Sequence, residues 1–369
     1  MSIVLDRLHL KNPIIIAAGP WARDKCSIQK CIDNGAAAVT TETITLEAHN
    51  NLSPHIYMQN SRMYNTKMFS DLDLEQWEKE INAIDKKDSK LICSIWGSSA
   101  SEISYLASKV ERMGADAIEI SLFSPIGTRN RMIIDQPEAV SQFVKAAVTS
   151  VNIPIFVKLS YEICNVPTIT KSIYDAGVHV VSAIDGFKGI MDVDIESNTV
   201  EMPTCGGLTG DLIRPMSLAT TATLKQNTQF QICSVGGIST YEHVLEFIML
   251  GADAIQLASA IQVNGYKIIS RITSGVQTWL HSHGYNEISD IRGKALSSLL
   301  PFEDIKTQPL IATLKTPCFK KCKKCINACL YGAIDYTKKR GVTINPSCCI
   351  GCGSCIAFCP YDNIIPRLI

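Results

Sequence analysis

The pentapeptide Gly114-Ala115-Asp116-Ala117-Ile118 recurs unchanged as Gly251-Ala252-Asp253-Ala254-Ile255. Each copy follows an amphipathic segment of helical length and leads into a short apolar run, which is the pattern of a turn from a surface helix into a buried strand. Two identical helix-to-strand turns indicate an architecture of repeated β-α units.

Outward from these turns, apolar runs and helix-length segments alternate over about 290 residues. The predicted strands lie at 12–18, 37–40, 91–96, 117–122, 154–158, 178–184, 231–235 and 254–257. The clearest predicted helices lie at 100–113, 137–148, 167–176 and 241–250. Eight buried strands alternating with helices predict an α/β protein with a (β/α)8 TIM barrel. A doubly wound sheet is the alternative, and the repeated turn favours the quasi-symmetric barrel.

Three long loops interrupt the alternation, from Thr43 to about Leu74, from Leu122 to Asp135 and from Asp185 to Met216. Long loops in a compact domain are usually functional. All three follow predicted strands, so in a barrel they rise from the carboxyl-end face, where active sites form.

The cysteines indicate a second domain, because nine of the fifteen lie between Cys318 and Cys359. In the bacterial ferredoxin pattern three closely spaced thiolates hold one cluster, and a fourth, before proline, binds the other. The chain has two such runs, and the second ends in Cys359-Pro360. They predict a small ferredoxin-like α+β domain with two [4Fe-4S] clusters, one held by Cys349, Cys352, Cys355 and Cys329, the other by Cys318, Cys322, Cys325 and Cys359.

Zinc sites and disulfide bonds are the alternatives for such cysteines. Neither explains a third cysteine at the same close spacing or a fourth before proline, so we prefer the iron–sulfur interpretation. One ligand stays open. Cys348 stands beside Cys349 and, as a ligand in its place, would give both runs the same opening gap.

The composition limits the function classes. The formal net charge is zero, which predicts no general attraction to nucleic acid or anionic membranes. No apolar stretch approaches eighteen residues and the N-terminus lacks signal-peptide features, so we expect a cytoplasmic protein. We expect the barrel in residues 1–300, a linker with Pro301 and Pro309 in 301–316, and the ferredoxin-like domain in 317–369.

Small residues follow the last two predicted strands, Gly236-Gly237 after the seventh and Ala258-Ser259 after the eighth. They let backbone N–H groups approach a phosphate, whose charge a helix N-terminus favours. In barrels this is the usual phosphate position. On its own, a glycine pair after a strand is often only a tight turn.

Further motifs stand in a fixed order along the chain: Gly19-Pro20, Thr45-Leu46-Glu47, Asn51-x-Ser53-Pro54, Lys158-Leu159, Gly206-Gly207-Leu208-Thr209-Gly210-x2-Ile213-Arg214-Pro215 and Gly236-Gly237-Ile238. In order and spacing they resemble the dihydroorotate dehydrogenase family. With the cysteine runs, the whole chain is similar to the dihydropyrimidine dehydrogenase branch, which joins an FMN barrel to a two-cluster ferredoxin domain.

The resemblance implies FMN as the cofactor. It places Lys158 at the N1/C2 carbonyl edge of the flavin, where an ammonium stabilises the negative charge of the reduced ring, so Lys158 is also a catalytic candidate. The other implied FMN contacts are Ala18, Gly19 and Thr41 near the ring, and Gly210, Gly236, Gly237, Ala258 and Ser259 at the phosphate.

The resemblance also implies a proton-transferring residue, which falls on Ser124 in the segment Glu119–Pro125. Dihydropyrimidine and many soluble dihydroorotate enzymes have cysteine there, whereas quinone-linked dihydroorotate enzymes have serine. A thiol titrates near pH ~8.5, but an alcohol is a far weaker acid and needs a relay or a basic partner. Ser124 is therefore either the proton donor or acceptor, or a residue that only lines the pocket.

The implied substrate contacts depart from the family. Glu42 stands where the family has a lysine, and acidic or hydroxyl side chains stand where it has asparagines: Asp71, Ser121, and either Ser182 or Asp185. An ionised carboxylate only accepts hydrogen bonds. A pocket with three carboxylates would repel a carboxylate substrate and favour a donor-rich or cationic one, unless Arg129 and Arg131 offset the charge.

No Gly-x-Gly-x-x-Gly motif follows a predicted strand, so we expect no nicotinamide site in this chain. We expect electrons to pass between FMN and the clusters, and on to a partner protein such as an FAD/NAD(P)-binding subunit or a ferredoxin. The predicted function is an oxidoreductase that acts on the CH–CH or C=C bond of a small substrate, as a homo-oligomer. The alternatives are dihydropyrimidine or dihydroorotate dehydrogenase itself, and a non-catalytic electron-transfer subunit.

Overall fold

The computed structural model describes residues 1–60, 62–127 and 136–368, so Arg129 and Arg131 lie outside the described residues. The chain divides into two compact units, Met1–Ser298 and Leu299–Ile369, each of which is described by itself. No helix among the described residues is long and apolar enough to span a membrane.

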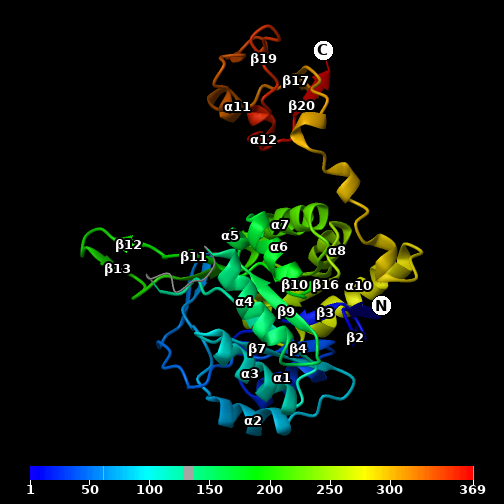
Figure 1. Cartoon of the computed structure of the whole chain (residues 1–369). Coiled ribbons are helices and arrows are strands. Elements are labelled where there is room, and N and C mark those ends of the chain that lie inside the picture. The colour runs from blue at the N-terminus through cyan, green and yellow to red at the C-terminus, as the bar shows by residue number, and fades with distance from the viewer. Residues whose placement is uncertain (61, 128–135, 369) are drawn as a thin grey trace. The chain divides into compact units, whose positions relative to one another are not determined.

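The first unit is a closed barrel of eight parallel strands (Figure 1). They follow one another around the barrel in chain order, and the last pairs with the first, Ile255 opposite Ile14. The prediction of a TIM barrel rather than an open doubly wound sheet is confirmed. The strands are β3 (Ile14–Ile16), β4 (Ala38–Thr40), β7 (Lys90–Ile95), β8 (Ala117–Ser121), β9 (Ile155–Leu159), β10 (Val180–Ala183), β15 (Gln231–Val235) and β16 (Ala254–Leu257).

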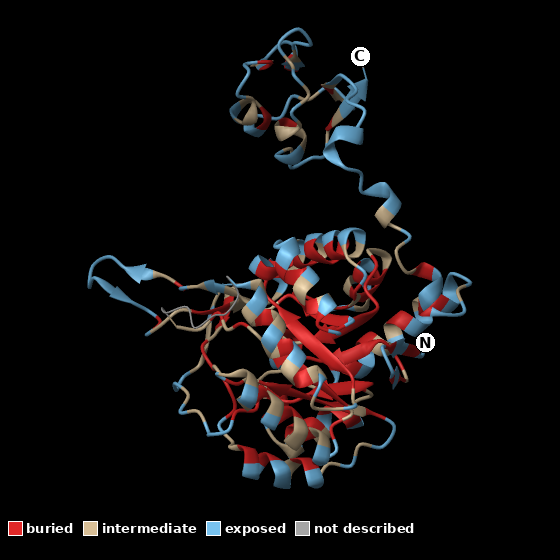
Figure 2. Ribbon diagram, viewed as in Figure 1, coloured by how far each residue is buried: buried red, intermediate tan, exposed pale blue. Residues whose placement is uncertain are grey.

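Helices surround the barrel, whose strands are buried almost throughout (Figure 2). Several helices begin at a side-chain cap, such as Asp24, which accepts the N–H of Ser27, and Thr240, which accepts that of His243. The helices are α1 (Lys25–Asp33), α2 (Leu74–Asn82), α3 (Ala100–Arg112), α4 (Pro137–Val148), α5 (Tyr161–Cys164), α6 (Pro167–Asp175), α7 (Arg214–Asn227), α8 (Tyr241–Met249), α9 (Ser259–Asn264) and α10 (Ile268–Ser282).

The two copies of the repeated pentapeptide make the same contacts. The N–H of Asp116 donates to Leu91 O at 2.8 Å, and its carboxylate accepts the Leu91 N–H at 2.8 Å. Asp253 makes the same two bonds to Ile232, at 2.8 and 2.9 Å. The aspartate thus fastens the start of its own strand to the strand before it, which explains why this turn recurs.

Replacing Asp253 with alanine is expected to lower the free energy of unfolding of the barrel by about 2–3 kcal/mol. The side chain is 5% exposed and also pairs with Arg292 at 3.0 Å, so its loss leaves a buried N–H and a guanidinium without their acceptor. Chemical denaturation followed by circular dichroism measures the change. The control is Asp194→Ala in an exposed hairpin, expected to stay within about 0.5 kcal/mol; an equal loss in both variants would contradict the role of Asp253.

The first and third long loops pair with each other. They form a four-stranded sheet in the order β11-β14-β6-β5, in which Asn65 of one loop lies opposite Gly207 of the other. The third loop also carries a hairpin that extends away from the barrel (Figure 1). The strands of the loops are β5 (Ile56–Gln59), β6 (Arg62–Asn65), β11 (Phe187–Gly189), β12 (Val193–Asp194), β13 (Thr199–Val200) and β14 (Gly206–Thr209), and the N-terminal hairpin is β1 (Ile3–Leu5) and β2 (Leu8–Leu10).

The second unit contains two antiparallel strand pairs and two short helices that pack around its cysteines. Cys325 and Cys355 lie on the helices and are buried in its small core. Its elements are β17 (Leu310–Leu314) paired with β20 (Ile364–Leu368), β18 (Ile334–Thr337) paired with β19 (Gly341–Ile344), α11 (Lys324–Ala328) and α12 (Ser354–Ala357).

Candidate active site

A large cleft lies at the carboxyl ends of the barrel strands, between the strand ends and the long loops. Its walls include Lys158 from β9 and Ser124 from the loop after β8. The space between the walls is about 1110 Å³, open solvent at the mouth included. Side chains from two paired strands, β8 and β9, thus meet in one cleft.

Lys158 is held by a buried polar network in the barrel interior. Its Nζ donates to Gln256 Oε1 at 2.9 Å and lies 3.6 Å from Glu119 Oε1. Gln256 Nε2 donates to Glu119 Oε2 at 2.9 Å, and Ser182 Oγ donates to the same oxygen at 2.5 Å. Side chains from three other strands thus hold the ammonium at the floor of the cleft. Ser182 belongs to this support and does not line the cleft.

Ser124 and Ser121 both line the cleft. Ser121 Oγ donates to Phe123 O at 3.2 Å, so it fixes the loop on which Ser124 stands. Ser124 Oγ accepts the N–H of Ile126 at 3.3 Å, and the side chain is half-buried. The hydroxyl group that the resemblance selected therefore lies in the same cleft as Lys158.

The glycine pair after β15 leaves no room for side chains. A Cβ on Gly236 would lie 2.1 Å from Ser217 Oγ, and one on Gly237 2.5 Å from Arg214 Cβ, and both residues have positive φ. Ser217 Oγ is buried without a hydrogen-bond partner among the described residues. The turn therefore packs its backbone directly against α7, and Gly236 also lines the main cleft, where no side chain covers its backbone.

The remaining predicted FMN contacts divide between two cavities and the barrel interior. Ala18, Gly19, Gly236 and Ala258 line the main cleft. Gly210 and Ser259 line the neighbouring cavity, which also includes Thr240. Thr41 lines neither; it is buried, and its Oγ1 accepts the N–H of Ser94 at 3.1 Å. The two cavities flank the glycine turn, as a flavin ring on one side and a phosphate on the other require.

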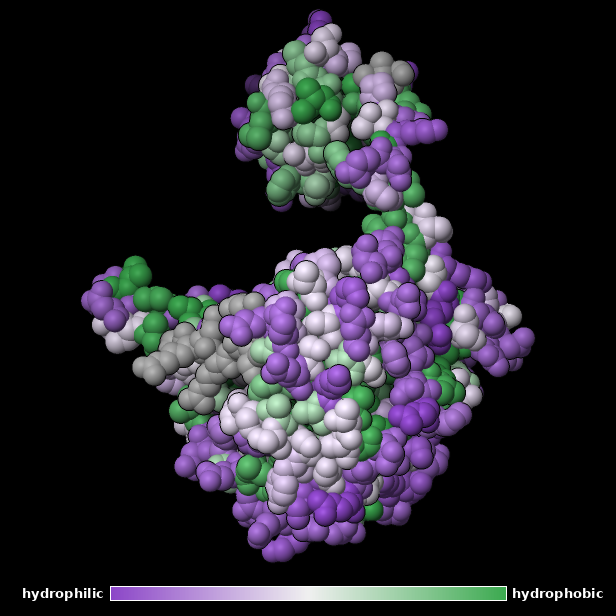
Figure 3. Space-filling model, viewed as in Figure 1, coloured by the Kyte–Doolittle hydropathy of each residue, from purple (hydrophilic) through white to green (hydrophobic). Residues whose placement is uncertain are grey.

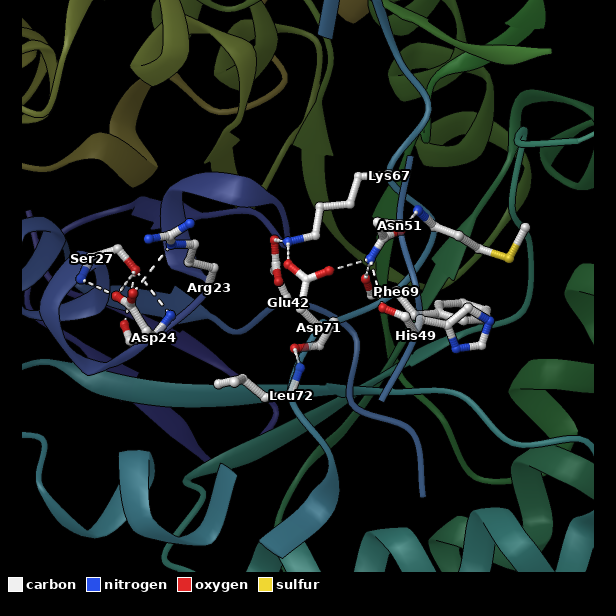
Figure 4. A network of polar contacts seen from close by, with 12 residues as sticks. Arg23, Asp24, Ser27, Glu42, His49, Asn51, Lys67, Phe69, Asp71 and Leu72 are labelled. Atoms are coloured by element: carbon white, nitrogen blue, oxygen red, sulfur yellow. Dashed lines mark hydrogen bonds and ion pairs between the residues drawn. The ribbon is translucent and has the colours of Figure 1, made fainter. Parts of the chain in front are cut away.

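The acidic residues predicted to contact the substrate do not form a purely acidic pocket. Glu42 lines the cleft, but Lys67, which also lines it, lies 2.9 Å from Glu42 Oε1 (Figure 4). Asp71 does not line the cleft; it accepts a hydrogen bond from Lys67 at 2.6 Å. The expected pocket with three carboxylates therefore has only Glu42 and Asp185 in its wall, and one lysine from the first long loop pairs with both Glu42 and Asp71.

Asp185 lines the cleft wall directly after β10. Desolvation raises the pKa of its carboxyl group, and the charge of Lys158 and the N–H of Gly186, which donates at 2.8 Å, act in the lowering direction. Only in its protonated form does such a carboxyl group both donate and accept hydrogen bonds, as an asparagine does.

The eight predicted cysteine ligands surround two cavities in the second unit. One cavity is lined by Cys329, Cys349, Cys352 and Cys355, and the other by Cys318, Cys322, Cys325 and Cys359. Backbone N–H groups point at the sulfurs, Ala312 to Cys349 and Ala333 to Cys329, both at 3.3 Å. Cys348 lines neither cavity; it is exposed and its Sγ lies 3.2 Å from Asn345 Nδ2.

Within the described residues, no three His, Cys, Asp or Glu side chains converge closely enough for a single metal ion. The cysteines stand around cavities instead of meeting at one point. Four thiols around each cavity, with backbone N–H donors to sulfur in the first, match the ligand set of an iron–sulfur cluster.

Four residues of the site escaped the sequence reading: Asn65, Lys67, Glu119 and Gln256. Glu119 and Gln256 carried a usable signal, because each is a polar residue inside an otherwise apolar buried strand. Lys67 and Asn65 carried none, because they reach the cleft through pairing of two loops far apart in sequence.

The chain matches two known protein families. Residues 2–280, well over half of the chain, match the family described as Dihydroorotate dehydrogenase. The chain belongs to the dihydroorotate dehydrogenase family. Residues 318–363 match the family described as 4Fe-4S dicluster domain. The protein is thus a flavin-type oxidoreductase of the dihydroorotate dehydrogenase family with a ferredoxin-like iron–sulfur domain, as the motifs predicted.

Two relatives show how the similarity is distributed. The Thermoplasma acidophilum Dihydroorotate dehydrogenase B (NAD(+)), catalytic subunit, is 28% identical over 299 residues, 80% of this chain and 99% of the relative. The NAD-dependent dihydropyrimidine dehydrogenase subunit PreA of Escherichia coli (strain K12) is 25% identical over 383 residues, 98% of this chain and 86% of the relative. The second similarity therefore includes the cysteine unit.

Among solved structures, DHODH from Eimeria tenella in complex with ferulenol is similar with a TM-score of 0.67 and 20% identity. The match covers 79% of this dihydroorotate dehydrogenase family member and 88% of that chain. At this identity the likeness supports the barrel fold alone.

Proposed function

We propose that this protein is the catalytic subunit of an oxidoreductase that acts on a CH–CH or C=C bond of a small cyclic, conjugated substrate. Electrons pass between FMN and a redox partner through two [4Fe-4S] clusters. The observation that carries the proposal is that Lys158, Ser124 and the glycine turn at Gly236 line one cleft at the carboxyl end of the barrel.

The residues present fit FMN. Gly236 lines the cleft without a side chain, which suits backbone approach to a phosphate, and the small residues Ala18 and Gly19 line the same cleft and leave room for the ring. When bound, FMN supplies a hydride acceptor and donor. Lys158 contributes a fixed positive charge, which Gln256 and Glu119 orient.

Ser124 is proposed to exchange the proton that accompanies hydride transfer. It stands on the loop after β8, and Ser121 fixes this loop by its bond to Phe123 O. An alcohol exchanges a proton only with help from a water or a basic group. Asp185, in the same cleft with a raised pKa, is a side chain of the class suited to such a relay.

A Ser124→Ala variant is expected to lose about 10²–10⁴-fold in turnover with its flavin content unchanged. A Ser124→Cys variant is expected to retain turnover, and its pH profile should show the ionisation of a thiol near pH ~8.5. Anaerobic stopped-flow reduction of the flavin measures both rates. Undiminished turnover in Ser124→Ala would remove Ser124 from the mechanism.

Two clusters are supported by the two separate four-cysteine cavities. A protein partner is supported by the surface of the second unit, where apolar side chains gather (Figure 3). Each of four exposed apolar residues is adjacent in sequence to a cavity cysteine: Phe319, Leu330, Ile350 and Phe358. Exposed apolar groups beside redox centres suit docking of an electron-transfer protein such as an FAD/NAD(P)-binding subunit or a ferredoxin. A reducing, cytoplasmic location agrees with fifteen unpaired cysteines.

Dihydropyrimidine and dihydroorotate are the first substrates to test, because the relatives are named for them. Anaerobic mixing of the flavin-loaded protein with dihydrouracil or dihydroorotate should reduce the flavin with one of them. If neither reduces it and no conjugated cyclic substrate reoxidises the reduced protein, the non-catalytic electron-transfer subunit becomes the better description.

A further inference from the structure

Glu42 and Lys67 form a buried ion pair in the wall of the cleft. Glu42 follows β4, whereas Lys67 follows β6 in the first long loop. Their side chains are 5% and 6% exposed, and Lys67 Nζ lies 2.9 Å from Glu42 Oε1. Both line the cleft, and they point toward each other from different segments (Figure 4). Lys67 thus places a positive charge beside Glu42 in the wall of the cleft.

Lys67 is held on its far side by Asp71 and Asn51. Lys67 Nζ donates to Asp71 Oδ2 at 2.6 Å, and Asn51 Nδ2 donates to Asp71 Oδ1 at 2.7 Å. Desolvation acts to raise the pKa of Asp71, but the hydrogen bonds from Lys67 and Asn51 lower it below the usual value. Asp71 therefore stays ionised and fixes the position of the ammonium.

Glu42 has unused acceptor capacity. Its Oε2 is buried and has no hydrogen-bond donor among the described residues, whereas Oε1 has Lys67 Nζ 2.9 Å away. Buried acceptors without a donor are costly, and native proteins rarely leave them so. A donor on a ligand in the cleft would remove that cost.

We propose that Glu42 and Lys67 together determine substrate specificity by recognising a neutral edge on which an N–H stands next to a carbonyl oxygen. The inference rests on the proposed function. An ammonium has three protons: one goes to Asp71, one faces Glu42, and the third is free for the carbonyl. Glu42 accepts the N–H. The three charged groups carry one net negative charge, which disfavours a substrate carboxylate at this end of the cleft.

Lys67 is also the main charge that opposes the raised pKa of Glu42. Burial raises the pKa of Glu42, the charges of Lys67 and Arg23 act to lower it, and that of Asp71 acts to raise it. Without Lys67 the carboxyl group is expected to take up a proton in the folded protein. Its folded-state pKa then exceeds the unfolded value, so stability falls as the pH rises.

The test uses the flavin-loaded full chain and the variants Lys67→Met, Glu42→Gln and their double variant. Flavin absorbance changes are titrated with uracil, which has the neutral edge, and with orotate, which adds a carboxylate. The wild type is expected to bind uracil about tenfold more tightly than orotate. Lys67→Met should weaken uracil binding by about tenfold, and Glu42→Gln should remove the preference against orotate. The double variant should bind uracil no more weakly than Lys67→Met alone.

A ligand-independent readout accompanies the titration. The stability of Lys67→Met should decrease from acid to neutral pH, and the double variant should lose that dependence because the amide that replaces the Glu42 carboxyl group does not titrate. Lys86→Met is the control, since Lys86 pairs with Asp116 at 2.8 Å outside the cleft. If neither Lys67→Met nor Glu42→Gln changes the affinity for uracil or orotate, the role of the ion pair in specificity is overturned, while the proposed function still stands. A wild-type flavin that responds to neither ligand, is reduced by neither dihydro substrate and is reoxidised by no conjugated cyclic substrate would overturn the proposed function and this inference with it.

Discussion

Replacing Cys355 with serine is expected to reduce the iron content from about eight to about four atoms per chain and to abolish electron transfer to an external acceptor. Cys355 is buried in the core of the second unit and lines one cavity with Cys329, Cys349 and Cys352. Loss of one of four ligands opens that cluster to solvent and oxidation. Iron analysis and anaerobic electron paramagnetic resonance of the reduced protein measure the change.

Cys348→Ser is the matched control. Cys348 stands beside the ligand Cys349, but it is exposed and lines neither cavity. Its replacement should leave the iron content and electron transfer unchanged, whereas Cys349→Ser should behave like Cys355→Ser. If Cys348→Ser loses iron and Cys349→Ser keeps it, the ligand assignment is the reverse of the one drawn from the cavity. A wild-type content near about four atoms would contradict the second cluster.

Replacing Lys158 with methionine is expected to slow flavin reduction by about 10²–10³-fold. The side chain stays unbranched and becomes one atom shorter, but the cleft loses the positive charge proposed to stabilise the reduced flavin, so the flavin reduction potential should become more negative. Glu119 keeps its hydrogen bonds from Gln256 and Ser182, so the barrel interior retains part of its network. Anaerobic stopped-flow kinetics and a redox titration of the flavin measure the two effects.

Lys171→Met controls for the loss of a lysine elsewhere. Lys171 is exposed on α6 and pairs along its own helix, with Asp175 at 2.5 Å. It should leave both the reduction rate and the potential unchanged. A Lys158→Met protein with a normal flavin content but an unchanged potential would mean that Lys158 acts on the barrel rather than on the flavin.

The positions of the barrel strands could be predicted from the sequence, because each is a short apolar run between helices. The predicted run at 231–235 coincides with β15, and that at 254–257 with β16. The structure explains why the repeated pentapeptide predicted repeated β-α units. Asp116 and Asp253 each bond to the backbone of the preceding strand, so the same local sequence solves the same packing problem twice.

The proposed cluster ligands could also be predicted from the local sequence. Within each run the cysteines are close in sequence, so chain geometry keeps them near one cavity, and the fourth ligand follows from the crossed ferredoxin pattern. Spacing alone left Cys348 and Cys349 as alternatives, because adjacent residues satisfy nearly the same spacing. The direction of each side chain, with only Cys349 of the two at the cavity, depends on the folded backbone.

The charge of the cleft could not be predicted from the sequence. Glu42 and Asp71 were visible as acidic departures, but their partner Lys67 is placed by β6, which pairs with β14 of a loop far along the chain. That pairing is a non-local event with no periodic signal. By itself, the sequence determined the barrel, the cysteine domain and the family, because these follow from local periodicity and spacing. Only the tertiary structure decided the electrostatics of the site, because Lys67 reaches Glu42 only when its loop has paired with a second loop far along the chain.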